Sequence, residues 1–302
     1  MEKVRILATT EWEEERIDKV IASEVAGLSR SFIQKLIKEG QLFVNDLPAK
    51  ANYRVKEGDD ILFFIPKAIE PDIRPEKMDL DILYEDNALL IVNKPKDMVV
   101  HPAPGHYSGT LVNGILYHCQ GNLSGINGIL RPGIVHRIDK DTTGALIVCK
   151  NDTSHNCIAA QLKEHSITRK YFAIVHGIIK EERGTIEGAI GRDPLDRKKM
   201  CINEKNGKPA VTHYQVLKRF SEHTYVCCQL ETGRTHQIRV HMTSIGHSLL
   251  GDELYGKRNS RLKLKGQTLH AGIIGFVHPS TGTYMEFEAP LPEYFSHLLE
   301  IL

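Results

Sequence analysis

The sequence predicts a mixed α+β protein that is divided into two domains, and three observations support this prediction. Short apolar runs bounded by polar residues recur along the larger part of the chain, as β-strands do. Between them lie segments whose apolar residues recur every three or four positions, which is helical spacing. A stretch with two prolines and alternating charge, residues 67–79, is typical of a linker and separates a short first part from a long second part.

The composition is that of a globular protein in a reducing compartment. The 302 residues carry a formal net charge of +1, so the whole chain shows no general attraction to polyanions. The six cysteines form no CxxC pair, which is typical of the cytosol. The N-terminus has no apolar secretory segment, and no apolar run reaches about 18 residues. We therefore expect a cytoplasmic protein that does not enter a membrane.

Residues 14–66 are expected to form a small domain of two helices followed by two strands. Ser29 can cap the second helix at its N-terminus, and Gly40 can cap it at its C-terminus. Apolar residues recur at helical spacing in residues 17–25 and 33–37, which predicts the two helices. Residues 42–46 and 58–66 are strand-like runs, which predict the two strands.

Residues 80–302 are expected to form one larger α+β domain. Its strand-like runs are 81–86, 88–95, 145–149, 171–177, 212–220 and 224–231. Its helical patterns are 111–119, 153–165 and 234–246.

The second helix of the small domain carries basic residues that could share one exposed face, namely Arg30, Lys35 and Lys38, with Lys50 as a further candidate. Such a face can grip phosphates without reading bases. The alternative is an ordinary solvated helix face. The run "LSRSFIQKLIKEGQLFVND", followed by "VKEGDDI", resembles the S4 RNA-binding module. That resemblance implies that the helix pair and the following strand lie against structured RNA.

The stretch "RPGIVHRIDKDTTGALIVCK", residues 131–150, places several charged side chains between two apolar runs. Gly133 and Gly144 bracket a loop that leaves one strand and enters another. Asp139 follows Arg137 by two residues, so a strand-like loop points both side chains to the same side, beside a cleft. The alternative is a charged turn on the surface.

The same stretch contains "HRIDKDTTGALIV", which closely resembles the signature of the RluA-type pseudouridine synthases. Further blocks fit that family in the same order over residues 80–295, among them "LLIVNKPKDMVVHPA", "RKYFAIVHG", "GRDPLDRKKM", "LETGRTHQIRVHMTSIGH" and "LLGDELYG". Within the family the sequence resembles the ribosomal large-subunit pseudouridine synthase D group. The resemblance implies a largely antiparallel central sheet with flanking helices and a basic cleft.

The resemblance also implies roles for named residues. Asp139 matches the essential aspartate of the family, and Arg137 matches the arginine that enters the base stack when the uridine is flipped out. Tyr171 matches the tyrosine that packs against the target base, with a role as a base late in the reaction as a further possibility. Arg234 matches the basic partner of the aspartate, with Arg239 as the alternative for that pairing.

The basic run that contains Arg192, Lys198 and Lys199 could close over RNA phosphates, or it could be a solvated connection. Histidines in "HQIRVH" are spaced by five residues, which does not set both on one helical face, so we expect no metal site.

The isomerisation of uridine involves no net redox change or hydrolysis, so we expect no cofactor. The implied substrate is 23S ribosomal RNA, with transfer RNA as an alternative, and we expect a monomer. Two other classes stay open on the sequence, namely an RNA-binding ribosome assembly factor and a metal-dependent hydrolase of nucleotides.

Overall fold

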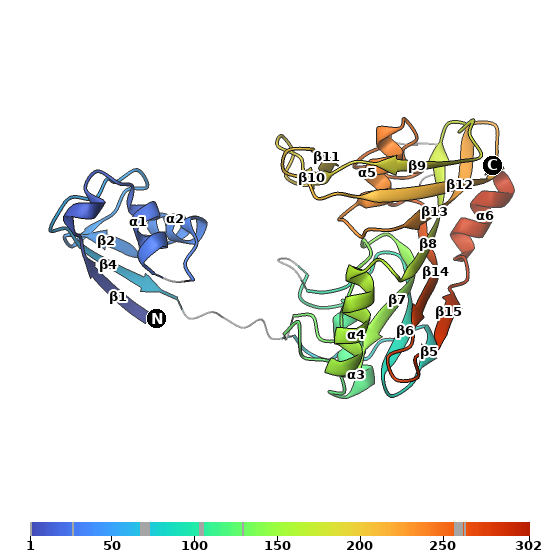
Figure 1. Ribbon diagram of the computed structural model, residues 1–302, viewed down its shortest axis with the longest axis horizontal. Coiled ribbons are helices and arrows are strands. Elements are labelled where there is room, and N and C mark those ends of the chain that lie inside the picture. Colours follow the sequence, from blue (N-terminus) through green and yellow to red (C-terminus); the bar gives the residue numbers. More distant parts are fainter. Residues whose placement is uncertain are drawn as a thin grey trace. The chain divides into compact units, whose positions relative to one another are not determined.

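The structure is a computed structural model that describes residues 2–25, 27–66, 73–102, 106–128, 130–256, 262 and 264–302. The chain divides into two compact units, residues 1–70 and residues 71–302 (Figure 1). No helix in these described ranges is long and apolar enough to cross a lipid bilayer.

The smaller unit packs two helices against an antiparallel sheet with the strand order β1-β4-β2-β3. Its elements are β1 (Glu2–Leu7), η1 (Thr10–Trp12), α1 (Ile17–Glu24), α2 (Arg30–Lys38), β2 (Leu42–Val44), β3 (Leu47–Pro48) and β4 (Asp60–Ile65). Ser29 caps α2, because its hydroxyl accepts the Phe32 N–H at 3.3 Å, and Gly40 follows the helix with a φ of 66°. The expected helix pair and its two following strands are confirmed.

The smaller unit begins earlier than residue 14, the start that the sequence suggested. Strand β1 pairs with β4 along its whole length, and its Val4 and Ile6 pack against the unit's core. Lys3, Arg5 and Leu7 alternate with them on the exposed side. Three of the six residues are charged, and such a short, interrupted apolar pattern gives a weak sequence signal.

The larger unit is built on one sheet with the strand order β5-β6-β7-β14-β8-β13-β12-β9, and β15 pairs with β14. Only the β7–β14 pair is parallel among these described strands. The expected largely antiparallel sheet is therefore confirmed. The elements are β5 (Ile82–Glu85), β6 (Leu89–Lys94), α3 (Leu111–Cys119), β7 (Thr143–Cys149), α4 (Asp152–Lys163), β8 (Thr168–His176), β9 (Arg183–Glu187), β10 (Ile190–Arg192), β11 (Met200–Ile202), β12 (Val211–Arg219), β13 (His223–Leu230), α5 (Gln237–Ser244), β14 (Leu269–Val277), β15 (Tyr284–Glu288) and α6 (Glu293–Ile301).

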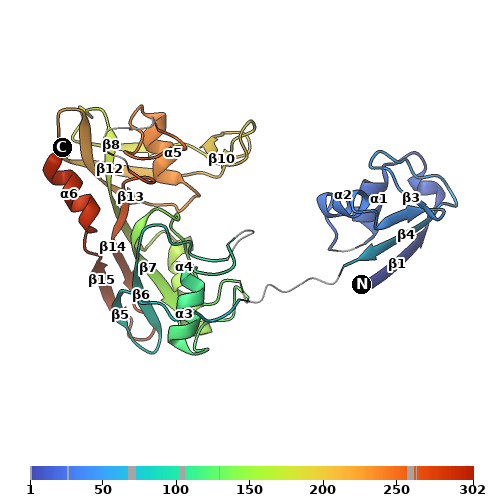
Figure 2. The same cartoon turned by 180° about the vertical axis from the view of Figure 1, so that it is seen from behind.

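The two faces of this sheet are covered by different helices (Figure 2). Along β8, Tyr171 and Ala173 belong to the core that includes residues of α3 and α5. The intervening Ile174 packs with Phe295 of α6. Since side chains of a strand alternate between faces, α3 and α5 lie on the Tyr171 side and α6 on the other.

Part of the expected linker packs with the larger unit. Ile73 is buried in its core, and the Glu76 N–H donates to the Asn113 carbonyl at 2.9 Å. Asn113 in turn donates from Nδ2 to the Arg74 carbonyl at 2.8 Å. Residues 73–79 are therefore anchored, because an apolar residue and backbone polar groups both find partners there. Residues 67–72 of the expected linker lie outside the described residues.

Candidate active site and RNA-binding surfaces

The loop between Gly133 and Gly144 is fixed at both ends by close backbone approach. The two glycines have φ values of 70° and 110°. A Cβ on Gly133 would lie 2.6 Å from the Cys149 carbonyl oxygen, and one on Gly144 would collide with the backbone of Ala271. Because other residues adopt such φ values only with strain, glycine is required at both positions.

Two side chains, the half-buried His136 and the fully buried Lys94, hold the same loop in place. His136 accepts a hydrogen bond from the Ile147 N–H at 3.0 Å, and burial lowers the pKa of His136 to about 3. Lys94, at the end of β6, is fully buried and donates to three main-chain carbonyls, including that of Lys140 at 2.9 Å. Burial lowers the pKa of Lys94 to about 7, although nearby carboxylates oppose this shift. The hydrogen bond from Lys94 therefore fixes the Lys140 carbonyl, one residue after Asp139, to the end of strand β6.

Asp139 lies on the wall of a cavity of about 530 Å³, bounded by this loop, the end of α4, strand β8 and the start of α5. Its side chain is 18% exposed. Among the described residues that line the cavity, Asp139 is the only carboxylate. The basic lining residues are Arg131, Arg137, Lys163, Arg169, Arg234 and Arg239. Arg137, Ile138 and Asp139 all line the cavity, and Ile138 is the most buried of the three. The expected basic cleft is present.

Arg239, rather than Arg234, is the partner of Asp139. Arg239 Nη1 donates to Asp139 Oδ2 at 2.9 Å. Arg234 instead donates from Nε to the Pro209 carbonyl at 3.0 Å. This corrects the pairing expected for Arg234 in favour of the alternative. The reason is position: Arg239 lies inside α5 on its buried side, whereas Arg234 precedes the helix in a turn closed by Gln237.

Arg239 also binds a second, fully buried carboxylate. Its Nε and Nη2 donate to the two oxygens of Asp252 at 2.7 and 2.9 Å. Burial alone would lower the pKa of Arg239, but the hydrogen bond and charge of Asp252, with the charge of Asp139, raise it above its ordinary value. The guanidinium is thus a permanent cation held between two carboxylates.

His236 and Tyr255 complete the surroundings of Asp139. His236 Nε2 lies 3.9 Å from Asp139 Oδ2, and its Nδ1 is 2.7 Å from the Tyr255 hydroxyl. The Tyr255 ring lies beneath Arg239, with the guanidinium carbon 4.9 Å from the ring centre. Burial lowers the pKa of His236, against the opposing charge of Asp139. An imidazole and a guanidinium therefore lie beside the carboxylate, and the Tyr255 ring contacts both of them.

Tyr171 lines the cavity from β8 and is 8% exposed. Burial raises the pKa of its phenol, with a smaller opposing effect from Arg169, so the hydroxyl stays protonated at neutral pH. Arg169 lies two residues earlier on the same face and donates to the Glu231 carbonyl at 2.8 Å. The cavity thus offers an aromatic face and a second buried guanidinium.

The expected basic loop is a short hairpin of β10 and β11. Arg192 is the last residue of β10, and its guanidinium donates a hydrogen bond to the Arg197 carbonyl. Lys198 is exposed in the turn. The Lys199 N–H closes the turn on the Asp196 carbonyl at 2.9 Å. The hairpin contacts α5, the helix that carries Arg239. These cations therefore project from an ordered element rather than from a loose connection.

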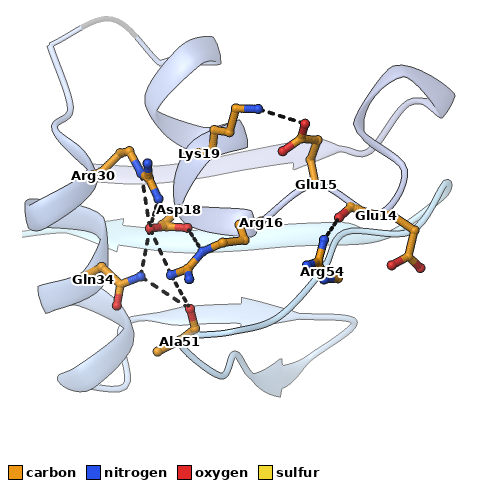
Figure 3. A network of polar contacts seen from close by, with 9 residues as sticks. All are labelled: Glu14, Glu15, Arg16, Asp18, Lys19, Arg30, Gln34, Ala51 and Arg54. Carbon is orange, nitrogen blue, oxygen red and sulfur yellow. Dashed lines mark hydrogen bonds and ion pairs between the residues drawn. The ribbon is translucent and has the colours of Figure 1, made fainter.

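In the smaller unit a buried carboxylate organises a group of cations (Figure 3). Asp18 accepts from Arg16 at 2.9 Å, from Arg30 at 3.0 Å and from Gln34 at 2.9 Å. Its side chain is 3% exposed, whereas those of Arg16 and Arg30 are 46% and 56% exposed. Arg30 is thus held by an ion pair, while Lys35 and Lys38 on the same helix are exposed at the surface.

Sequence reasoning missed Lys94, Asp252 and Tyr255. Lys94 directly follows a continuous apolar strand and precedes a proline, which is a signal of forced burial. Asp252 follows an apolar run and a glycine, so it gave a weaker hint of the same kind. Within the described ranges no three His, Cys, Asp or Glu side chains gather so that they could hold a metal ion.

Comparisons with known proteins bear on this site. Residues 88–244 match the family described as RNA pseudouridylate synthase, and residues 15–61 match the S4 domain. The chain is 54% identical over 302 residues to the "Uncharacterized RNA pseudouridine synthase YlyB" of Bacillus subtilis (strain 168), which covers 100% of this chain and 99% of that protein. It is 44% identical over 297 residues to the "Ribosomal large subunit pseudouridine synthase D" of Zymomonas mobilis, which covers 95% and 93%.

Among solved structures, "Human RNA Pseudouridylate Synthase Domain Containing 1" matches with a TM-score of 0.58 at 31% identity, over 71% of this chain and 84% of that chain. The fold, the basic cleft around Asp139 and these relatives define one class of protein. The chain belongs to the RNA pseudouridylate synthase family. It is an RNA-directed isomerase that also carries an S4 domain.

Proposed function

We propose that the protein converts specific uridines of large-subunit ribosomal RNA to pseudouridine, with Asp139 as the catalytic carboxylate and the target nucleotide flipped out of its stack. One observation supports this most directly. Asp139 is the only carboxylate among the described residues lining a cavity whose other charged groups are cations. The cations attract the RNA backbone to the cavity, and Asp139 can then contact the nucleotide that enters it.

The chemistry asks for one anionic group and no cofactor. The N1–C1′ bond breaks, the base turns and the C5–C1′ bond forms. The C5 hydrogen leaves as a proton, and the freed N1 takes up a proton, so that no atom is gained or lost. Asp139 can attack C1′ or C6, or accept the proton of C2′. Its Oδ2 is held by Arg239, whereas Oδ1 accepts no hydrogen bond from any residue that the structure describes. Oδ1 is therefore the oxygen that we assign to the reaction.

A stacked base cannot reach Asp139, so the nucleotide has to leave its helix at a cost of about a few kcal/mol. Arg137 is exposed beside the cavity, and its planar cation can stack in the vacated space. Tyr171 offers its ring to the extruded base. Because burial raises the pKa of Tyr171, we favour this packing role over a role as general base.

Two further surfaces would hold the RNA around the reacting nucleotide. The hairpin with Arg192, Lys198 and Lys199 is one, and α2 with Arg30, Lys35 and Lys38 is the other. Contacts of this kind bind phosphates and carry no sequence information. The choice of ribosomal RNA rests on relatives that are named ribosomal large subunit pseudouridine synthase D, such as the one from Zymomonas mobilis. We place the protein in the cytoplasm as a monomer.

Mapping of pseudouridine in total RNA tests this function. Cells that lack the protein are compared with cells that carry it and with cells that carry the Asp139→Asn form. We expect the same few large-subunit uridines to stay unmodified in the deletion and in the variant. Losses confined to transfer RNA would replace the proposed substrate. Unchanged pseudouridine together with defective ribosome assembly would favour a binding factor instead.

A further inference from the structure

One short turn, residues 252–255, holds both groups that flank the Asp139 carboxylate. Asp252 binds Arg239 with two hydrogen bonds. Tyr255 binds His236 at Nδ1. Neither residue of the turn lines the cavity, to judge from its described lining. The turn therefore acts on Asp139 only through intermediaries.

We propose that Asp252 and Tyr255 are positioning residues of the isomerase, which fix the orientation and the charge environment of Asp139 from behind. This inference rests on the proposed catalytic role of Asp139. Asp252 acts through Arg239, and Tyr255 acts through His236.

Asp252 determines how Arg239 meets Asp139. A guanidinium can give two parallel hydrogen bonds to one carboxylate. Here the Nε and Nη2 pair is used by Asp252, so Nη1 makes a single bond to Asp139 Oδ2. Asp252 is itself fixed, because its Oδ1 also accepts the backbone N–H groups of Leu254 and Tyr255 at 3.0 and 3.2 Å. Asp139 Oδ1 is thereby left open, and the charge of Arg239 is shared between two anions.

Tyr255 determines how His236 meets Asp139. The phenol oxygen accepts the Met200 N–H at 2.7 Å, which leaves the phenol proton for His236 Nδ1. Nε2 then carries the imidazole proton on the side of Asp139, 3.9 Å away. His236 has a φ of 56°, a strained value for a residue with a side chain, so its position needs such a restraint. Because Met200 begins β11, the same hydroxyl also ties the basic hairpin to this site.

A pH–rate profile reports these effects together with those of every nearby charge. The charged or titratable groups around Asp139 are Lys94 from β6, Arg137 and Asp141 from its own loop, Arg169 and Tyr171 from β8, His236 and Arg239 at the start of α5, and Asp252 and Tyr255 from the turn. Removing the charge of Asp252 leaves Asp139 as the sole anion on Arg239. Arg239 should then attract Asp139 more strongly, so that this carboxylate reacts more weakly.

The test measures single-turnover tritium release from large-subunit ribosomal RNA transcribed with uridine tritiated at C5. For Asp252→Asn we expect the rate to fall about 10- to 100-fold with RNA affinity unchanged, since small misplacements cost this much. The acid limb of its pH–rate profile should move to lower pH. For Tyr255→Phe we expect a loss of about tenfold with a smaller change in that limb.

Asp86→Asn is the matched control, because Asp86, although partly exposed, is also a carboxylate that accepts two backbone N–H groups, those of Ala88 and Leu89. It should keep the wild-type rate. An equal loss in Asp86→Asn, or a loss in Asp252→Asn that follows RNA affinity, would overturn the positioning role.

Asp139→Asn separates this inference from the proposed function. Turnover in that variant would overturn both. If Asp139→Asn is inactive but Asp252→Asn keeps the wild-type rate and pH profile, the positioning role alone is overturned. If Asp252→Asn does not fold, Tyr255→Phe decides, because it removes one hydroxyl and keeps the ring beneath Arg239.

Discussion

Arg239 donates from Nη1 to Asp139 Oδ2 at 2.9 Å, although 100 residues separate the two along the chain. The contact joins the start of α5 to the loop that precedes β7, so it depends on the complete larger unit. The same guanidinium binds Asp252 with its other two nitrogens. Only a planar fork with several donors can satisfy both carboxylates at once.

Replacing Arg239 by lysine should therefore nearly abolish activity, while the same change at Arg234 should not. A lysine ammonium cannot reproduce the three hydrogen bonds of Arg239, and we expect a rate loss of about 100-fold or more. Arg234→Lys loses a bond to the Pro209 carbonyl and should cost only about a few-fold. Tritium release from both variants checks this. Equal losses would show that Arg234 also acts on the reaction.

Asp139→Asn should abolish isomerisation and leave RNA affinity within about a few-fold of wild type, because one charge among many cations contributes little to phosphate binding. Tritium release measures the first effect and filter binding the second. Asp141→Asn is the matched control, since it changes a carboxylate of the same loop that is absent from the described cavity lining. Retained turnover in Asp139→Asn would refute the assignment.

Asp18→Asn should destabilise the smaller unit at neutral pH by about 1–3 kcal/mol, because it weakens several hydrogen bonds of a buried carboxylate. Burial opposes ionisation of Asp18, but its bonds to Arg16, Gln34 and Arg30 outweigh this and lower its pKa. The unfolded chain thus takes up this proton first as the pH falls, so the contribution is complete above about pH 4 and declines below it. The difference between variant and wild type should shrink in the same range.

Trp12 makes this measurement specific. It is the only tryptophan of the chain, and it packs against the core of the smaller unit. Its fluorescence during urea unfolding therefore reports on that unit alone. Asp60→Asn is a suitable control, because its partner Arg5 is largely exposed and Asp60 itself is 26% exposed, against 3% for Asp18, so this pair should matter less. A pH-independent difference for Asp18→Asn would contradict the proposed ion-pair effect.

Lys35→Gln with Lys38→Gln should weaken RNA binding and flatten its salt dependence. If both lysines meet phosphates, the slope of log affinity against log salt should fall by roughly 0.7–0.9 for each. Binding to the ribosomal transcript is measured over a series of salt concentrations. Lys19→Gln is the control, since Lys19 lies on α1 and its ion pair with Glu15, at 2.8 Å, is closer than the Lys35–Glu39 pair at 3.7 Å. An unchanged slope in the double variant would mean that this helix does not bind RNA.

Local patterns in the sequence predicted much of the fold. The helical spacing over 111–119 coincides with α3, and Ser29 caps α2 as its position suggested. Strand β1 escaped notice because it borders the sheet and three of its six residues are charged, which interrupts its apolar pattern. The anchoring of residues 73–79 was also missed, since a single buried Ile73 leaves no periodic signal.

The site was only partly accessible from the sequence. Asp139 and Arg137 were assigned because their loop resembles the family signature, whereas the alternation and the two glycines alone left a charged surface turn as an alternative. The choice between Arg234 and Arg239 depends on where α5 begins relative to the core, which spacing alone does not determine. The pairing of Arg239 with Asp252 spans 13 residues and requires burial of both charges. Such a contact becomes visible only when the chain is folded.

The loop that carries Asp139 is clamped by two glycines that tolerate no side chain, by His136 and by the ammonium of Lys94. Because Asp139 is held in a fixed position, the RNA has to change its conformation to bring the target uridine to this carboxylate. Uridines in loosely stacked or mismatched positions should accordingly react faster than those in stable duplex. The pattern of modified nucleotides would then record where the ribosomal transcript opens as much as which bases surround each uridine.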